Sequence, residues 1–271
     1  MTGSHTDHSE GPGTVDVVRA RDVDDLARRA ARDAVHLIAQ AQTGGGVGGD
    51  GRARIVLTGG GAGIAVLREL AVLDHAATAQ ADSFPVTAVD WSRVDVFFGD
   101  ERYVPADDPE RNDGQADRAL FDHVAVPPEN IHRYAAPAPG DDPAGDGLEE
   151  AAAAYATVVE THAPDGFDLH LLGMGPEGHV NSLFPDRAEL VSTETVVPVR
   201  DCPKPPPERV SLTLDAVGRA DAVWLLVAGE AKREAAGHAL SGDDATAWPA
   251  AGARGRRSTV LYVDAAADPT R

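Results

Sequence analysis

The 271-residue chain contains a single cysteine, Cys202, which cannot form an internal disulfide. This excludes the disulfide-stabilised scaffolds of small secreted proteins. No apolar run approaches the roughly 18–20 residues that a membrane helix needs. Residues 1–10 have neither the basic region nor the apolar run of a secretion signal. We therefore expect a soluble, cytoplasmic protein with no membrane partner.

Cationic residues are scarce, because 24 lysines and arginines face 44 aspartates and glutamates and leave a formal charge of −20. Such a field repels nucleic acid and anionic membrane surfaces, so neither is an expected partner. An anionic small-molecule substrate would need cations gathered locally against this field. Each lysine or arginine near the end of a predicted strand is therefore a candidate ligand.

Several signatures of metal and covalent chemistry are missing. The chain has no His-Glu-x-x-His segment and no cysteine pair, and its closely spaced His5 and His8 lie in a predicted tail, so we expect no metal site. It also lacks the Gly-x-Ser-x-Gly turn that presents a serine nucleophile. These absences disfavour covalent catalysis and leave water activated by a histidine base.

Strand patterns alternate with helix patterns over nearly the whole chain. Apolar strands are predicted at 15–18, 55–57, 94–98, 167–172, 195–199, 222–227 and 259–263, and helices at 22–42, 63–73, 115–123, 148–161 and 230–240. This order predicts an α/β fold with a mostly parallel sheet and helices on both faces. Residues 14–271 are predicted to form one domain. Residues 1–13 are predicted to be a disordered tail, 43–51 a flexible connection and 74–90 a loop or insertion.

Two predicted strands end in loops rich in ionisable residues. These loops are the glycine-rich stretch Gly173–His179 and the stretch Gly99–Arg102. Ligands of parallel α/β proteins bind at the carboxyl ends of strands, so we expect His179 and Asp100 to share one active site. Glu177 is placed to fix the imidazole tautomer of His179. A hydrogen-bonded surface histidine and a solvated charged turn are the alternatives.

A loop of three glycines, Gly59, Gly60 and Gly61, joins a predicted strand to a predicted helix. This arrangement aims backbone N–H groups and the positive end of a helix at a phosphate. No Gly-Lys-Ser/Thr follows, so the loop is not an ATP-binding P-loop. Ile64 stands where a dinucleotide fingerprint has its third glycine. A tight turn with close helix–strand packing explains the glycines equally well.

Four cations lie near predicted strand ends. Arg102 ends one of the charged loops, Lys204 and Arg209 lie in the proline-rich segment 203–209, and Lys232 begins a predicted helix. Because each proline fixes φ, the segment is stiff and can present its two cations to an anionic ligand. A rigid spacer explains the segment as well, and a solvated surface position explains Lys232.

Five segments of the chain together match the pattern of one known family. They are Leu57–Gly61, Phe98–Pro105 with Asn112, Leu172–Pro185, Pro203–Leu214 and Gly229–Lys232. In this order, over about residues 15–264, the set is specific although each segment alone is weak. The chain thus resembles the 6-phosphogluconolactonases. Their fold is similar to that of glucosamine-6-phosphate deaminases and ribose-5-phosphate isomerases, which implies a single Rossmann-like α/β domain without a nucleotide cofactor.

The resemblance implies hydrolysis of 6-phospho-D-glucono-1,5-lactone to 6-phosphogluconate in the pentose phosphate pathway. His179 would take a proton from the attacking water, with Glu177 or Asp100 orienting the imidazole. Activity would decline on acidification as the imidazole is protonated, near its ordinary pKa of about 6.5 unless Glu177 raises that pKa. Glycine-loop N–H groups or Arg102 would stabilise the oxyanion. A functional association with glucose-6-phosphate dehydrogenase, which makes the unstable lactone, is a further implied partnership. The implied phosphate ligands are Arg102, Lys204, Arg209 and Lys232.

The chain departs from the family pattern at two places. Glu177 stands where many relatives have aspartate, and Gly61–Ile64 offers no hydroxyl, so phosphate binding by this loop would rest on backbone N–H groups. Two rival functions share the fold or the cations. The isomerases and deaminases typically have the sequence Asp-Glu-Tyr where this chain has Asp100–Arg102. They have Asn-Glu-Pro where it has Leu183–Pro185. A non-catalytic sugar-phosphate sensor would not need His179.

Overall fold

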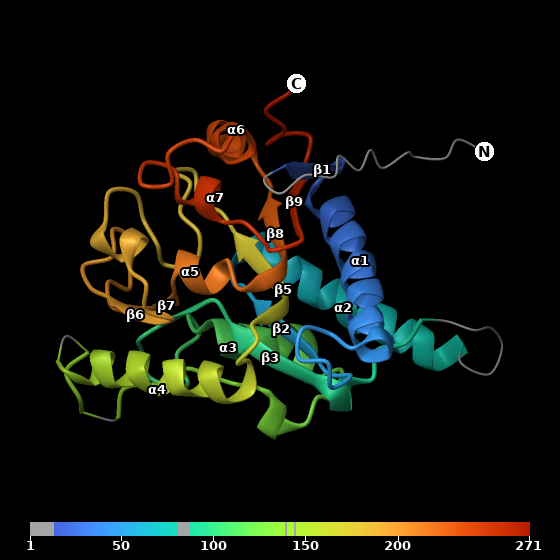
Figure 1. Ribbon diagram of the computed structural model, residues 1–271, viewed down its shortest axis with the longest axis horizontal. Coiled ribbons are helices and arrows are strands. Elements are labelled where there is room, and N and C mark those ends of the chain that lie inside the picture. Colours follow the sequence, from blue (N-terminus) through green and yellow to red (C-terminus); the bar gives the residue numbers. More distant parts are fainter. Residues whose placement is uncertain (1–13, 81–86, 139, 144) are drawn as a thin grey trace.

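A six-stranded parallel sheet forms the centre of the fold (Figure 1). The computed structural model describes residues 14–80, 87–138, 140–143 and 145–271, and its sheet has the order β1-β9-β8-β5-β2-β3. β2 and β3 are buried along their whole length, and apart from Arg54 and Asp95 their side chains are apolar. The predicted mostly parallel α/β sheet is confirmed. The strands are β1 Val15–Arg19, β2 Ala53–Leu57, β3 Val94–Phe98, β5 Phe167–Gly173, β8 Ala220–Val227 and β9 Ser258–Val263.

Helices cover both faces of the sheet, as predicted. In Figure 1, α1 (Val23–Gly44) and α2 (Gly60–Gln80) lie to the right of the sheet and contact each other, and α5, α6 and α7 lie to its left. A short α3 continues into a π-helical turn at Asp117–Phe121. The remaining helices are α3 Asn112–Ala116, α4 Gly147–His162, α5 Leu214–Val217, α6 Arg233–Ser241 and α7 Pro249–Gly252.

α1 shows how the sequence specifies a helix locally. The Asp22 carboxylate accepts a hydrogen bond of 2.8 Å from the backbone N–H of Asp25, and this cap begins the helix. Leu26 and Ile38 are fully buried, while Asp24, Arg29, Arg32 and Asp33 are exposed. Gly45, with φ +73°, ends the helix. The predicted capped amphipathic helix at 22–42 is confirmed.

A second, antiparallel sheet lies beside the main one and was not predicted. Its order is β4 (Asp100–Arg102), β7 (Arg209–Leu212) and β6 (Val196–Val199). The sequence predicts β6 as a strand, but it indicates only a charged loop at β4 and a proline-rich spacer before β7. β4 and β7 are three and four residues long and polar in part, so they have no clear alternation. Their pairing places Arg102 opposite Arg209.

The predicted loop at 74–90 is wrong over its first part. α2 begins at Gly60 rather than residue 63 and continues to Gln80, with Ala77 buried. The indole N–H of Trp91 donates a 2.7 Å hydrogen bond to Asp74 and attaches this half of α2 to the chain before β3. Its alanine-rich sequence has a weak helical periodicity, which explains the error. Residues 81–86 and the predicted tail 1–13 lie outside the described residues.

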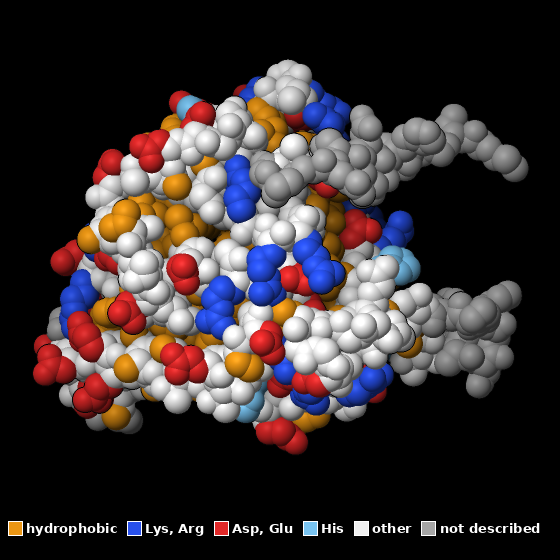
Figure 2. All heavy atoms as spheres, viewed as in Figure 1, with side chains coloured by type: hydrophobic (Ala, Val, Ile, Leu, Met, Phe, Trp, Pro, Cys, Tyr) orange, Lys and Arg blue, Asp and Glu red, His pale blue; other side chains and the backbone are white. Residues whose placement is uncertain are grey.

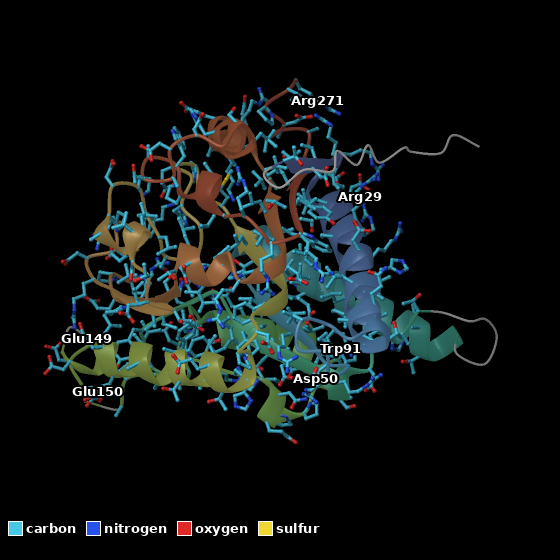
Figure 3. The ribbon with its side chains drawn as sticks, viewed as in Figure 1. Arg29, Asp50, Trp91, Glu149, Glu150 and Arg271 are labelled. Atoms are coloured by element: carbon cyan, nitrogen blue, oxygen red, sulfur yellow. The ribbon has the colours of Figure 1, made fainter. Side chains whose placement is uncertain are left out.

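Charged side chains of both signs are spread over the surface. Figure 2 shows acidic and basic side chains interspersed on one face, and Figure 3 shows Arg29 and Glu149 near the edge of the view. Several form local ion pairs, such as Asp50 with Arg54 at 2.7 Å. Among the described residues, no helix is both long and apolar enough to cross a bilayer.

Candidate active site

The carboxyl ends of four adjacent strands meet at one cavity of about 250 Å³. β2, β3, β5 and β8 each lead into a segment that contributes to its wall. Eight of the ten site residues proposed from the sequence line this cavity; Glu177 contacts His179 instead, and Gly61 does neither. The lining residues are Thr58, Gly59, Gly60, Asp100, Arg102, Asn112, Gly173, Met174, Gly175, Pro176, His179, Asn181, Lys204, Arg209 and Lys232.

His179 is held between an acid, a cation and an aromatic ring. Its Nδ1 lies 3.1 Å from Oε1 of Glu177 and 3.4 Å from Nζ of Lys204. Lys204 Nζ lies 2.7 Å from the same Glu177 oxygen. The imidazole stacks on Phe184 with a centroid separation of 4.4 Å, and its side chain is only 18% exposed.

This environment keeps the imidazole neutral. Burial and the positive charge of Lys204 lower the pKa of His179 to about 4, although Glu177 and Asp100 act in the opposite direction. The ordinary value of about 6.5 assumed from the sequence therefore does not hold. At neutral pH the ring can accept a proton, as a general base must.

The glycines of the His179 loop are required by close packing. A Cβ on Gly175 would lie 2.0 Å from Nδ1 of His179 and 2.7 Å from Oε2 of Glu177. Gly178 has φ +80°, and a Cβ there would lie 2.9 Å from the ring of Trp248. Gly175 thus lets the His179 and Glu177 side chains lie close to the backbone, and Gly178 does the same for Trp248, whereas the sequence had suggested close approach of a ligand.

Asp100 and Glu101 are neighbours with different roles. Asp100 lines the cavity, and its carboxylate accepts hydrogen bonds from Ser182 Oγ at 2.6 Å and Asn112 Nδ2 at 3.1 Å. Glu101 is 1% exposed and accepts from the backbone N–H groups of Asn112 and Asp113, at the start of α3. Burial and the nearby Asp113 raise the pKa of Glu101 to about 7. Asp100 therefore faces the cavity, whereas Glu101 points away from it and holds the start of α3.

Two of the cations keep donors for a ligand. Lys232 lines the cavity and has no ion-pair partner within the described part of the chain, and burial, with the charge of Lys204, lowers its pKa. Arg102 donates to the carbonyl of Glu110 at 2.8 Å and to the side chain of Asn112, while its Nε is buried without a partner. Both are therefore suited to bind an anion at the cavity.

Arg209 uses most of its N–H donors in hydrogen bonds within the protein. Its guanidinium donates to the carbonyl groups of Lys204, Pro205 and Pro206, each at 3.1 Å. Its Nη1 lies 4.0 Å from Asp100. Arg209 thereby fixes the proline-rich segment that carries Lys204, so the segment is stiffened by this arginine as well as by its prolines.

Two glycines of the predicted phosphate loop face the cavity at the start of α2. A Cβ on Gly59 would lie 2.0 Å from Oδ1 of Asn112, and Gly60 has φ +77°. The N-terminus of a 21-residue helix attracts negative charge at this position. Gly61 is exposed and lies outside the cavity wall.

Asn112 and Asn181 line the cavity but received no role from the sequence, although both belong to the segments that match the family pattern. Asn112 bridges Asp100 and Arg102, and Asn181 adopts a left-handed backbone with φ +49° and lines the cavity. A φ in this region is unusual outside glycine and typical of asparagine, so the sequence His179-Val-Asn181 held a weak signal. Among the described residues, no group of three metal-ligating side chains lies in this cavity.

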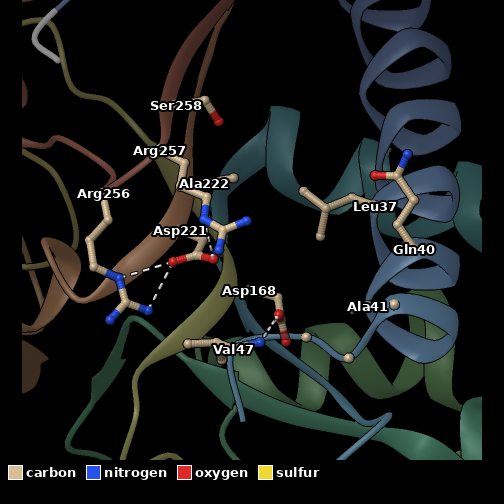
Figure 4. Close-up of a pocket in the computed structure, with 13 residues that line it drawn as sticks. Leu37, Gln40, Ala41, Val47, Asp168, Asp221, Ala222, Arg256, Arg257 and Ser258 are labelled. Atoms are coloured by element: carbon tan, nitrogen blue, oxygen red, sulfur yellow. Dashed lines mark hydrogen bonds and ion pairs between the residues drawn. The ribbon is translucent and has the colours of Figure 1, made fainter. Parts of the chain in front are cut away.

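A larger cavity of about 570 Å³ lies at the opposite, amino ends of the strands (Figure 4). Its charged side chains already have partners. Asp221 pairs with Arg256 at 2.9 Å and with Arg257 at 3.1 Å, and Asp168 accepts from the backbone N–H of Val47 at 2.7 Å. The larger cavity therefore has fewer unpaired charged side chains that could bind or activate a substrate than the smaller cavity.

Comparison with known proteins relates the chain to one family of sugar-phosphate enzymes. Residues 21–262 match the family model described as "Glucosamine-6-phosphate isomerases/6-phosphogluconolactonase". A 6-phosphogluconolactonase of Mycobacterium tuberculosis is 50% identical over 82% of this chain and 86% of its own length. That of Streptomyces coelicolor is 45% identical over 94% of both chains. The crystal structure of the Thermotoga maritima 6-phosphogluconolactonase has a TM-score of 0.74 and 26% identity, and the match covers 93% of this chain and 99% of that one.

Proposed function

Because the chain belongs to the glucosamine-6-phosphate isomerase and 6-phosphogluconolactonase family, we propose that it hydrolyses 6-phospho-D-glucono-1,5-lactone with His179 as general base. Relatives named 6-phosphogluconolactonase at 45–50% identity support lactone hydrolysis over deamination. The observation that supports the mechanism is the neutral, half-buried His179 held by Glu177 and Lys204 at a cation-rich cavity.

The proposed reaction uses a water molecule as nucleophile. With Nδ1–H donated to Glu177, the lone pair of His179 lies on Nε2. Nε2 takes a proton while the water oxygen bonds to C1 of the lactone, and the carbonyl oxygen becomes an oxyanion. When the carbonyl re-forms, the C1–O bond to the ring oxygen breaks and the ring oxygen receives the proton from Nε2. A positioned base of this kind contributes about 10² to 10⁴ in rate.

The remaining groups bind the two negative charges of the reaction. We assign the oxyanion to backbone N–H groups of Gly59 and Gly60, where the α2 dipole favours negative charge. The phosphate is assigned to Lys232 and Arg102, which retain free donors. Lys204 acts chiefly on His179, since its ammonium lies next to both the imidazole and Glu177.

A functional association with glucose-6-phosphate dehydrogenase is part of the proposal. The rabbit "GDH/6PGL endoplasmic bifunctional protein" is 35% identical over 187 residues, which are 68% of this chain and 22% of that protein. A separate chain would meet the same unstable lactone by diffusion or by contact with the dehydrogenase.

The test is direct measurement of lactone lifetime. Purified protein is added to a glucose-6-phosphate dehydrogenase reaction, and lactone loss is compared with the spontaneous rate. We expect a protein-dependent acceleration, and no ammonia release when glucosamine-6-phosphate is supplied instead. An unchanged lactone lifetime would contradict the proposal, and ammonia release would favour the deaminase reaction.

A further inference from the structure

Three metal-ligating side chains from separate elements converge at the edge of the main sheet. Asp95 is the second residue of β3, His132 follows the 3-10 turn Pro128–Asn130, and His162 is the last residue of α4. One ligand atom from each lies within 4.8 Å of the others. The cluster lies near the amino end of β3, whereas the proposed active site follows the carboxyl end of the same strand.

Two of the three ligand positions are rigid. The backbone N–H of His132 donates a 2.8 Å hydrogen bond to the carbonyl of Val96, and the His132 ring stacks on Phe97 at 4.5 Å. Its Nε2 lies 3.2 Å from Oδ1 of Asp95. The other Asp95 oxygen accepts a 2.6 Å hydrogen bond from Nε of Arg52, which fixes the carboxylate.

The third ligand can adjust. His162 is exposed, and its ring lies 4.3 Å from that of His132. A tetrahedral zinc site has metal–ligand distances of about 2.0–2.2 Å, so its ligand atoms lie roughly 3.3 Å apart. The Asp95–His132 pair already has this spacing, at 3.2 Å. The ligand nitrogen of His162 lies within 4.8 Å of the other two ligand atoms, and a rotation of its side chain can bring it to roughly 3.3 Å from them.

We propose that Asp95, His132 and His162 bind a divalent transition-metal ion of the zinc type. Two imidazoles and one carboxylate suit this class of ion, and a water molecule from the exposed side of His162 would complete four-fold coordination. The ion replaces the proton shared by His132 Nε2 and Asp95 Oδ1. Arg52 orients the ligating carboxylate, and its charge limits the affinity. The bound ion ties the end of α4 to β3.

Zinc-dependent thermal stability of the full chain tests the proposal. Wild type, His162→Phe and His123→Ala are melted with EDTA and then with added Zn²⁺. The phenylalanine keeps a ring against His132 but has no ligand nitrogen, and His123 is an exposed histidine that does not belong to the cluster. His5 and His8 are present in all three proteins, so any zinc binding by them is common to the series.

We expect Zn²⁺ to raise the Tm of wild type and His123→Ala by roughly 2 °C or more, and that of His162→Phe by much less. Substituted Co²⁺ should give visible d–d absorption in wild type that is lost in His162→Phe. His162→Ala serves in place of the phenylalanine variant should that one fail to fold. An equal zinc shift in the His162 variants, or no shift and no cobalt spectrum in wild type, would overturn the proposal.

Discussion

At the scale of single residues, strand geometry separates two adjacent acids. Successive side chains of a strand point to opposite sides, so Asp100 faces the cavity while Glu101 faces the start of α3. The sequence Gly-Asp-Glu-Arg shows four polar or flexible residues and does not reveal this division. Candidate catalytic acids are therefore distinguished by their partners, and Glu177 is the acid in contact with His179.

Replacing His179 with asparagine tests the general base. Asparagine keeps a polar group in the loop but cannot accept a proton near neutral pH, so we expect kcat to fall by about 10² or more. The Tm should change little, because His179 is partly exposed and its loop is set by glycines. Lactone hydrolysis at close to the wild-type rate would move the assignment to Asp100 or Glu177.

The pH dependence of activity reports the pKa of His179. Because burial and Lys204 lower that pKa to about 4, the neutral base is present above this pH and is lost as the pH falls through it. We expect kcat/KM to stay constant as the pH falls through the ordinary histidine pKa of about 6.5, and to decline only near pH 4.

Lys204→Met should move this acid limb to higher pH, since the substitution removes a positive charge beside the imidazole. Burial still acts on the ring, so the shift should stop short of the ordinary pKa of about 6.5. Lys232→Met is the matched control, because Lys232 is not among the groups that lower the pKa of His179. Identical acid limbs in Lys204→Met and wild type would show that Lys204 does not tune the base.

Lys232→Ala tests phosphate binding by comparison of two lactones. A hydrogen bond to a charged group contributes about 1.5–3 kcal/mol, so kcat/KM for the phosphorylated lactone should fall by roughly 10-fold or more. Unphosphorylated gluconolactone lacks the phosphate, so kcat/KM for this substrate should change little. Equal losses on both lactones would place Lys232 away from the phosphate.

At the scale of elements, the small antiparallel sheet organises the cation side of the site. β7 carries Arg209, β4 carries Arg102, and the segment before β7 carries Lys204. Arg209 holds that segment through three carbonyl groups. Its contribution to activity should therefore be indirect.

Arg209→Ala and Arg209→Lys separate this indirect role from phosphate binding. Neither side chain can bridge the three carbonyl groups, so the segment with Lys204 should loosen and kcat/KM should fall on both lactones by a similar factor. The lost buried hydrogen bonds should also lower the free energy of unfolding by about 1–3 kcal/mol. A loss confined to the phosphorylated lactone would instead make Arg209 a phosphate ligand.

Elements with a strong apolar pattern were predicted correctly, and those formed by tertiary pairing were not. The all-apolar run in β8 and the capped periodicity of α1 are local signals. β4 and β7 exist because each supplies the backbone partner of the other, which no local window contains. In the site, charged residues near predicted strands were found, whereas Asn112 and Asn181 received no role because their partners Asp100, Arg102 and Leu212 lie elsewhere in the chain.

The metal-ligand cluster shows the same limit. Its side chains lie on three elements, and His132 is separated from Asp95 by 37 residues. Motif searches detect ligands on one helix or one turn, so the sequence led us to expect no metal site. Side-chain convergence of this kind is visible only after the elements are packed.

At the scale of the whole molecule, the parallel sheet gives its two ends different properties. Cations with free donors lie at the carboxyl ends, whereas the charged groups that line the larger cavity at the amino ends already have partners. Cavity size therefore does not identify the active site. The direction of the strands does, because all six are parallel and share one carboxyl edge.

Asp221→Asn tests this division of the molecule. Asparagine keeps the shape of the side chain at the amino-end cavity but removes the charge that pairs with Arg256 and Arg257. Both arginines are well exposed, so the free energy of unfolding should fall by only about 0.2–1 kcal/mol. We expect kcat/KM for the phosphorylated lactone to remain within about twofold of wild type, the opposite of His179→Asn, which should lose activity with little change in stability. A several-fold loss of kcat/KM in Asp221→Asn would mean that the amino-end cavity takes part in the reaction.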